Sequence, residues 1–289
     1  MIAGSTFRVF PCGSVAELIF AVLTGLTAAC MPAAAQTIVT PYVPTPQVTV
    51  DEMLRLAEVN EKDFVIDLGS GDGRLVITAA RKFGARGMGM DIDENLVMES
   101  EENARQAGVA ERVKFVQQDF FKADISQATV ITMYLLPSVN MQLRPTLLSL
   151  KPGTRIVSHD FDLGDWPPDR KTTVRKNTFL WIVPAPVAGR WQTRLPLPPI
   201  ERHIELELTQ RYQEVSGRAR LNGVPTPVWE LALTGDRLSF VVVDTTDREN
   251  EASLYFTGRV LGDVIEGEMT RGVGAARSTI RWRAARGGT

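Results

Sequence analysis

The stretch that decides the fold is VIDLGSGDGR, residues 65–74. An apolar run opens it and predicts a β-strand, and Leu75–Lys82 after it has the amphipathic pattern of a helix. Gly69, Gly71 and Gly73 lie between the two, where glycine lets the backbone turn sharply and lets a ligand approach the main chain. Ligands of open α/β sheets bind at this carboxyl end of a strand. The stretch therefore predicts a strand, a tight turn and a helix, with a ligand site at the turn.

The spacing of glycines and acids around the turn indicates which ligand it suits. A dinucleotide fingerprint places its third glycine three residues after the second, whereas Gly73 follows Gly71 by two. Asp67 puts a carboxylate at the mouth of the turn, where it would repel a pyrophosphate and attract a cation. Asp91 ends the next predicted strand, 22 residues after Gly69, where a carboxylate can accept hydrogen bonds from both ribose hydroxyls. A ribose with a cationic tail and no pyrophosphate describes S-adenosylmethionine.

These features resemble those of a known superfamily. The run at residues 65–74 resembles motif I of class I S-adenosylmethionine-dependent methyltransferases, and Asp91 resembles the acid that binds the ribose of their cofactor. Asp119 follows the third predicted strand and is similar to the acid that meets the adenine amino group there. The resemblance implies an α/β, Rossmann-like fold and S-adenosyl-L-methionine as the cofactor. It implies cofactor contacts at Asp67, Gly69, Gly71, Asp91 and Asp119.

Two further blocks resemble a narrower set, the protein-lysine methyltransferases that include the ATP synthase c-subunit enzyme. They are PYVPTP at residues 41–46 and YLLP at residues 134–137. The stretch at residues 147–161 resembles the same set but departs from it at Ser158 and His159. This resemblance implies a protein acceptor and points to lysine. Enzymes with very different substrates share motif I, so a small-molecule methyl acceptor stays open.

Several residues near these blocks are candidates for contact with the cofactor or the acceptor. Tyr42 and Thr45 can close over the methionine part of the cofactor, or belong to a linker. Tyr134 stands where the fourth predicted strand meets the pocket, where it can line the transfer channel or pack at a strand end. His159 ends the fifth predicted strand and can serve as a base or be a structural histidine. Asp119 can instead be an acid at the start of a helix. Tyr134 and His159 are the catalytic candidates.

The pattern of apolar residues changes once along the chain. From about Val50 to Val183, apolar strand-like runs alternate with amphipathic stretches, as in a mostly parallel sheet covered by helices. From about Gly189 the helical period is absent, and short alternating runs lie between turn residues. We expect a Rossmann-like methyltransferase domain at residues 36–187. Residues 188–289 predict a small antiparallel β barrel or sandwich of unknown role.

Residues 1–35 have the layout of a secretory signal peptide. Leu18–Met31 carries no charge, but a membrane span needs about 20 residues and this segment is shorter. The small residues Ala33–Ala35 predict cleavage before Gln36. The expected product is exported to the periplasm and has no stable membrane insertion. An uncleaved anchor, or translation from Met31 that would leave the protein cytosolic, are the alternatives.

Composition excludes some classes of partner. The chain has 32 Lys+Arg against 34 Asp+Glu and a formal net charge of −2, so it has no basic field to hold a nucleic-acid backbone. Only two cysteines, Cys12 and Cys30, and two histidines, His159 and His203, are present, too few for a Cys/His zinc site. No metal is predicted, although an all-carboxylate cation site stays open.

The sequence therefore predicts an exported transferase that uses S-adenosylmethionine to methylate a protein or a small molecule. Two alternatives belong to other classes of protein. The chain can bind S-adenosylmethionine without transferring its methyl group. It can also be an envelope ligand-binding protein that acts through the β domain, supported by the first domain.

Overall fold

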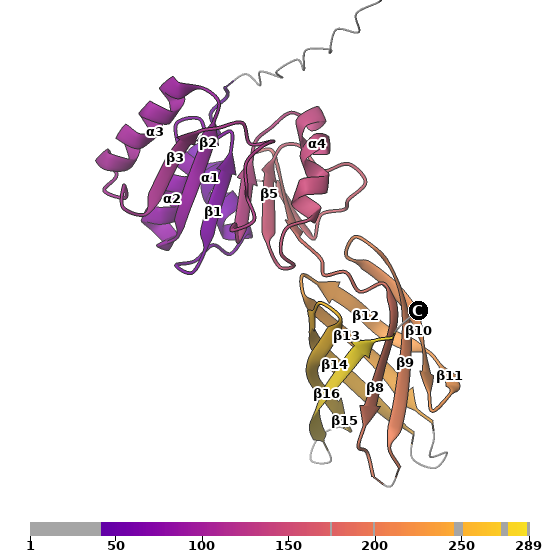
Figure 1. The fold of residues 1–289 in the computed structure, drawn as a ribbon. Helices are drawn as coiled ribbons and strands as arrows, with labels where there is room; N and C mark the ends of the chain where they lie inside the picture. The colour runs from indigo at the N-terminus through magenta and orange to yellow at the C-terminus, as the bar shows by residue number, and fades with distance from the viewer. Residues whose placement is uncertain (1–41, 174, 199, 246–250, 273–276, 288–289) are drawn as a thin grey trace, which may run out of the picture. The chain divides into compact units, whose positions relative to one another are not determined.

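The computed structural model describes residues 42–173, 175–198, 200–245, 251–272 and 277–287, which form two sheets (Figure 1). The predicted signal peptide lies outside these residues. The first sheet has the order β3-β2-β1-β4-β5-β7-β6, and β1 to β5 are parallel, whereas β7 runs antiparallel to both β5 and β6. Its strands are β1 Phe64–Leu68, β2 Arg86–Asp91, β3 Val113–Gln117, β4 Val130–Met133, β5 Arg155–His159, β6 Arg170–Thr173 and β7 Asn177–Ile182.

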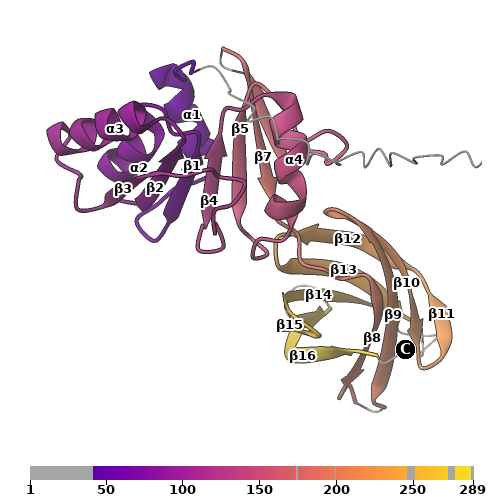
Figure 2. The same cartoon turned by 45° about the horizontal axis from the view of Figure 1, so that its top comes forward.

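Helices cover both faces of this sheet, as Figures 1 and 2 show. They are α1 Gln47–Leu56, α2 Arg74–Phe83, α3 Glu94–Gln106 and α4 Pro137–Leu148. Successive strand residues point to opposite faces, so Val65 and Val130 pack against α1 and α2 while Ile66 and Ile131 pack against α4. All four side chains are fully buried, which stabilises the fold by roughly 1.5–3 kcal/mol each. The predicted Rossmann-like fold is confirmed.

The order of the strands reverses between β1 and β4, because the chain winds outward from β1 through β2 to β3 and then returns to the other side of β1. Such a switch point leaves a crevice at the carboxyl ends of the two central strands. The glycine-rich turn after β1 and the YLLP block after β4 both lie there. The fold therefore brings together the two blocks singled out in the sequence.

The second sheet has nine antiparallel strands in the order β11-β10-β9-β8-β16-β15-β14-β13-β12. Its two edge strands, β11 and β12, are consecutive in the chain and separated only by Pro227, so one bent segment connects the edges. This sheet is a nearly closed barrel, which decides between the predicted barrel and sandwich. The strands are β8 Gly189–Leu195, β9 Arg202–Arg211, β10 Glu214–Leu221, β11 Val224–Thr226, β12 Val228–Thr234, β13 Arg237–Asp244, β14 Ala252–Leu261, β15 Val264–Arg271 and β16 Ser278–Arg286.

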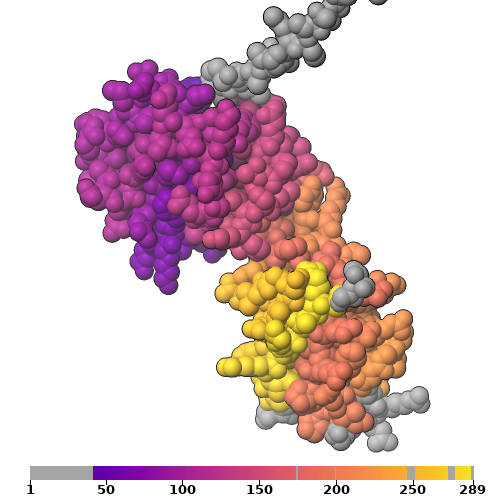
Figure 3. All heavy atoms as spheres, viewed as in Figure 1, coloured from indigo at the N-terminus to yellow at the C-terminus, as the bar shows by residue number. Residues whose placement is uncertain are grey.

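Buried apolar side chains form a core inside the barrel. The rings of Phe240 and Phe256 stack 4.5 Å apart, and Trp282 meets Phe256 edge-on at 5.1 Å. A buried ion pair, Arg202 with Asp244, joins the start of β9 to the end of β13. Figure 3 shows the outer surface of the described residues as spheres, in the colours of Figure 1. Within the described residues, no helix is long and apolar enough to cross a bilayer.

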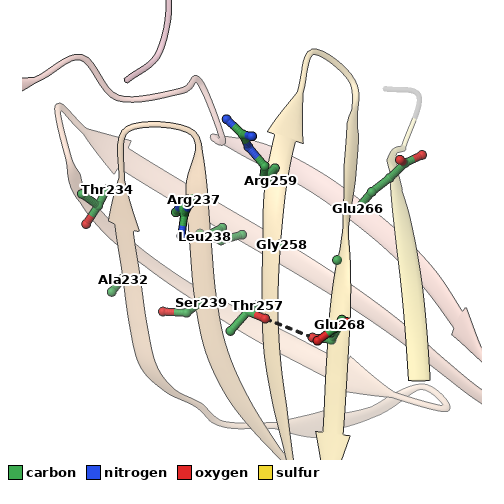
Figure 4. Close-up of a pocket in the computed structure, with 11 residues that line it drawn as sticks. Ala232, Thr234, Arg237, Leu238, Ser239, Thr257, Gly258, Arg259, Glu266 and Glu268 are labelled. Atoms are coloured by element: carbon green, nitrogen blue, oxygen red, sulfur yellow. Dashed lines mark hydrogen bonds between the residues drawn. The ribbon is translucent and has the colours of Figure 1, made fainter. Parts of the chain in front are cut away.

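A shallow groove runs over the outer face of β12 to β15 (Figure 4). Its lining includes Arg237 and Arg259, which lie directly opposite each other on β13 and β14. Asp236 forms an ion pair of 2.5 Å with Arg259, whereas Arg237 has no acidic partner among the described residues. Like charges opposite each other on adjacent strands destabilise a sheet. Arg237 and Arg259 are therefore a like-charge pair in which an acid compensates Arg259 but not Arg237 within the described residues.

Candidate active site

The turn after β1, residues 69–73, is here called the glycine loop. Gly69, Gly71 and Gly73 have φ of +75°, +53° and +79°, a backbone region that favours glycine. The N–H groups of Gly69 and Ser70 both donate to the carbonyl of Met90 at 2.9 Å, which ties the loop to the end of β2. A Cβ on Gly73 would lie 2.7 Å from the Phe115 ring. The loop therefore needs glycine for its turn and for close packing.

Asp91 faces the glycine loop from the end of β2. Its Oδ2 accepts a hydrogen bond from the Gly71 N–H at 2.9 Å, and its Oδ1 accepts one from the Asp93 N–H at 3.1 Å. A carboxylate has about four lone-pair sites. The two bonds fix the orientation of Asp91 and leave acceptor sites for a pair of ribose hydroxyls, so this residue fits the role expected for it.

Asp67 is buried, with 2% of its surface exposed, rather than standing at an open mouth of the turn as we expected. The Thr132 hydroxyl donates to its Oδ1 at 2.7 Å. Burial raises the pKa of Asp67 to about 8; the hydrogen bond from Thr132 opposes this shift, and Asp91 adds to it. Asp67 has no cationic partner among the described residues. A buried carboxyl of this kind beside a glycine loop fits a positively charged ligand, whose charge would favour the ionised form.

Asp119 is engaged by neighbours close in sequence. Its Oδ1 accepts from the Phe121 N–H at 3.0 Å, and its Oδ2 lies 3.2 Å from the Lys122 ammonium. No helix begins at this position, so the alternative of a helix-terminal acid is wrong. Asp119 closes a local turn after β3, and its side chain is one third exposed. An adenine contact stays a prediction.

Residues 42–46 form a strap that connects two parts of the site. A Cβ on Gly71 would lie 2.2 Å from the Tyr42 ring, so this ring stands against the glycine loop. Arg74 donates through Nη1 to the Thr45 carbonyl at 2.8 Å. The Thr45 hydroxyl lies 3.5 Å from Nδ1 of His159. Both predicted residues of this segment therefore contact the site, at opposite ends of the strap.

Three aromatic rings at the carboxyl ends of β4 and β5 form what we call the acceptor wall, which consists of Tyr134, His159 and Phe161. The Tyr134 ring lies 4.1 Å from the His159 ring and 6.2 Å from the Phe161 ring, centroid to centroid. A Cβ on Gly69 would lie 3.1 Å from Leu135, the residue after Tyr134. The acceptor wall is therefore next to the glycine loop.

The strand register explains this proximity. Asp67, Thr132 and Val157 are directly opposite one another on β1, β4 and β5. Two residues further along each of the three chain segments are Gly69, Tyr134 and His159, at the carboxyl edge of the sheet. The register thus assembles the catalytic candidates and the cofactor candidates from local motifs that are far apart in sequence.

His159 has an unsatisfied ring nitrogen. Only 2% of the residue is exposed, and Nε2 is buried without a hydrogen-bond partner among the described residues. Burial lowers the pKa of His159, so the ring is neutral at pH 7. When Nδ1–H donates to Thr45, Nε2 carries a lone pair. A buried unpaired acceptor is costly, which is a reason to look for a ligand that pairs with it.

The turn after β5 is strained and firmly held. Asp160 has φ of +69°, and the Phe161 N–H donates across it to the His159 carbonyl at 2.9 Å, which makes a γ-turn of the rare positive-φ kind. The Ser158 hydroxyl donates to the Phe161 carbonyl at 2.6 Å, and the Asn140 amide donates to the Asp162 carbonyl at 3.1 Å. Backbone strain of this kind is found at functional sites.

Sequence reasoning missed Thr132 and Phe161. Thr132 is a fully buried polar residue inside the apolar run of β4, which was a usable signal for a buried partner. The sequence contains no comparable signal for Phe161, because its ring joins the acceptor wall only through the turn at Asp160. Among the described residues, no group of three or more His, Cys, Asp or Glu side chains is placed to hold a metal ion.

Comparisons with known proteins agree with this site. The family model of the ANTKMT methyltransferase domain matches residues 67–170. A protein-lysine N-methyltransferase of Saccharolobus islandicus is 48% identical over 130 residues, which cover 44% of this chain and 81% of that protein. The ATP synthase c-subunit lysine N-methyltransferase of Mus musculus is 32% identical over 133 residues, which cover 46% of this chain and 53% of that enzyme.

A solved structure is also similar. The RNA methyltransferase of Salinibacter ruber, in complex with S-adenosyl-L-homocysteine, has 56% sequence identity and a TM-score of 0.49, covering 50% of this chain and 96% of that chain. The residues matched by the family model contain the glycine loop, Asp91 and the acceptor wall. The chain therefore belongs to the family of S-adenosylmethionine-dependent methyltransferases that contains these protein-lysine N-methyltransferases.

Proposed function

We propose that the chain transfers the methyl group of S-adenosylmethionine to the ε-amino group of a lysine in a protein. The observation that carries the proposal is the buried, unpartnered Nε2 of neutral His159, set in an aromatic wall beside the glycine loop. The relative from Saccharolobus islandicus, which is named a protein-lysine N-methyltransferase, supports the choice of acceptor.

S-adenosylmethionine supplies, when bound, a methyl group on a positively charged sulfur. Asp91, the backbone of the glycine loop and buried Asp67 are the residues that would hold it. A lysine ammonium cannot react until it loses a proton. The free amine then forms the new C–N bond with its lone pair, while the C–S bond breaks and its electron pair stays on sulfur.

In this proposal His159 receives the proton. With Nδ1–H directed to the Thr45 hydroxyl, the Nε2 lone pair accepts the proton of the acceptor ammonium and later releases it to solvent. The low pKa keeps the ring unprotonated and ready at pH 7. Tyr134 and Phe161 present ring faces to the aliphatic part of the lysine and to its charge. These residues therefore bind and orient the amine and exclude water.

The test uses the full chain with a methyl-labelled donor and three acceptors: poly-L-lysine, a mixture of folded proteins and total RNA. We expect N-methyl-lysine by mass spectrometry, no product with Asp91→Ala, and a rate lower by about 10²-fold with His159→Gln at unchanged donor affinity. Label on RNA with none on lysine would overturn the lysine assignment. Donor binding without any product would point to a cofactor-binding protein instead.

We also propose that the chain is exported, on the basis of the signal-peptide layout of residues 1–35. Mass-spectrometric sequencing of the amino terminus of the protein isolated from its host tests this. A start at Gln36 supports export, whereas a start at Met31 places the protein in the cytosol.

A further inference from the structure

A lysine of the chain itself lies at the acceptor wall. Lys176, just before β7, has its Nζ 2.5 Å from Oδ2 of Asp160, and 52% of its side chain is exposed. Asp160 and then the phenol of Tyr134 raise the pKa of Lys176, so both groups favour its ammonium form. The ammonium group of Lys176 therefore already lies at the edge of the acceptor wall, where we propose that the ammonium group of the substrate binds.

The carboxylate that holds this ammonium is fixed in place. Asp160 is the central residue of the strained γ-turn, and its own N–H donates to the Asn177 carbonyl at 2.7 Å. Asn and Asp tolerate positive φ better than most residues, but the conformation still costs energy. Ser158 and Asn140 hold the turn from either side. The turn thus points one rigid carboxylate at the rim, next to His159.

The Lys176–Asp160 pair contributes little to the stability of the fold. The two strands it bridges, β5 and β7, are already joined by a five-residue ladder from Arg155 to His159. The side chains of Lys176 and Asp160 are 52% and 20% exposed, and ion pairs that solvent reaches in this way are typically weak. The ion pair contributes little to the stability of the fold, yet it lies on a strained turn at the edge of the site. It can therefore break during the reaction at little cost to the fold.

We infer that Asp160 is the anchor for the substrate's ammonium group, and that Lys176 occupies this anchor until the substrate lysine displaces it. The inference rests on the proposed lysine acceptor. It makes Lys176 an internal competitor, which has the same charge as the substrate and is always present. Only acceptors that make further contacts with the chain would displace it efficiently, so the contact raises selectivity against isolated lysines.

The experiment compares initial rates on poly-L-lysine for the full-length chain and for Lys176→Met. We expect the variant to have a KM about two- to fivefold lower at unchanged kcat, because the ion pair between Lys176 and Asp160 no longer has to be broken. Lys171→Met is the matched control, since this lysine lies on β6 with its Nζ 5.0 Å above the Phe179 ring and away from Asp160. The control should match the unmodified chain.

Asp160→Asn tests the anchor itself, and asparagine keeps the tolerance for positive φ. We expect a higher KM, and no gain from adding Lys176→Met. Circular dichroism confirms that each variant is folded. If the unmodified chain methylates lysine and Lys176→Met leaves KM unchanged or raises it, the inference is wrong while the proposed function stands.

If no lysine product forms, a binding measurement tests the ammonium anchor at Asp160 separately from the proposed methylation of lysine. Saturation-transfer NMR with n-butylammonium reports on the anchor without any methyl transfer. Stronger binding by Lys176→Met than by the unmodified chain, lost again in the double variant with Asp160→Asn, supports the anchor although the lysine acceptor has failed. Equal binding by all three chains overturns the anchor.

Discussion

Replacing Asp67 by asparagine should change how the stability of the first domain depends on pH. Asp67 is 2% exposed and receives one hydrogen bond, from Thr132, and its pKa rises from 3.8 to about 8. Between these two values the folded protein holds a proton on Asp67 that the unfolded chain does not. The free energy of unfolding therefore falls by about 1.4 kcal/mol for each pH unit, up to about 6 kcal/mol in all. This contribution is fully present below pH 3.8 and is lost as the pH rises to about 8.

Asparagine has the shape of the protonated acid and can still accept from Thr132, so the variant should lack this slope. Between pH 5 and 7 we expect Asp67→Asn to gain about 3 kcal/mol relative to the unmodified chain. Urea unfolding without cofactor, followed by circular dichroism at the helix band, measures it. All helices of the described residues lie between Gln47 and Leu148, so the signal reports on the first domain. Asp263→Asn, an exposed barrel residue, is the control. Parallel pH profiles for Asp67→Asn and the unmodified chain would refute the reasoning.

Binding of S-adenosylmethionine to the unmodified chain should release close to one proton at pH 6.5, because a bound cation ionises Asp67; calorimetric titration in two buffers of different ionisation enthalpy counts it. Gly71→Ala should lower cofactor affinity by about tenfold or more, because the new Cβ would lie 2.2 Å from Tyr42. The control is Gly108→Ala, which has φ of +69° but open space around it and should leave the affinity unchanged in the same titration. Arg237→Thr should raise the stability of the barrel by about 0.2–1 kcal/mol in urea unfolding followed by tryptophan fluorescence, since Arg259 no longer faces a like charge.

Much of the cofactor side of the site could be predicted because its determinants are local. The glycine loop, the strand before it and the helix after it form one continuous stretch, residues 64–83. Asp91 could be placed because the carboxyl ends of adjacent parallel strands meet at one edge. Tyr134 and His159 followed from the same rule, applied to the fourth and fifth strands.

The remaining features depend on pairings between distant segments. Thr132 reaches Asp67 across 65 residues of sequence, and nothing local to either residue specifies that contact. Lys176 meets Asp160 only because β7 runs antiparallel beside β5. Closure of the barrel depends on one bent segment at Pro227, so short alternating strands alone were equally compatible with a sandwich.

The strap at residues 42–46 connects the two sides of the candidate site. Tyr42 lies on the glycine loop, and Thr45 lies on His159, so one short segment contacts both the glycine loop and the acceptor wall. If the first substrate to bind orders the strap, the second substrate does not have to supply that free energy again. Each substrate then binds more tightly when the other is already bound, because the coupling between two sites is reciprocal. Binding of either substrate should therefore strengthen binding of the other, and an amine analogue should raise the affinity of the chain for S-adenosylhomocysteine.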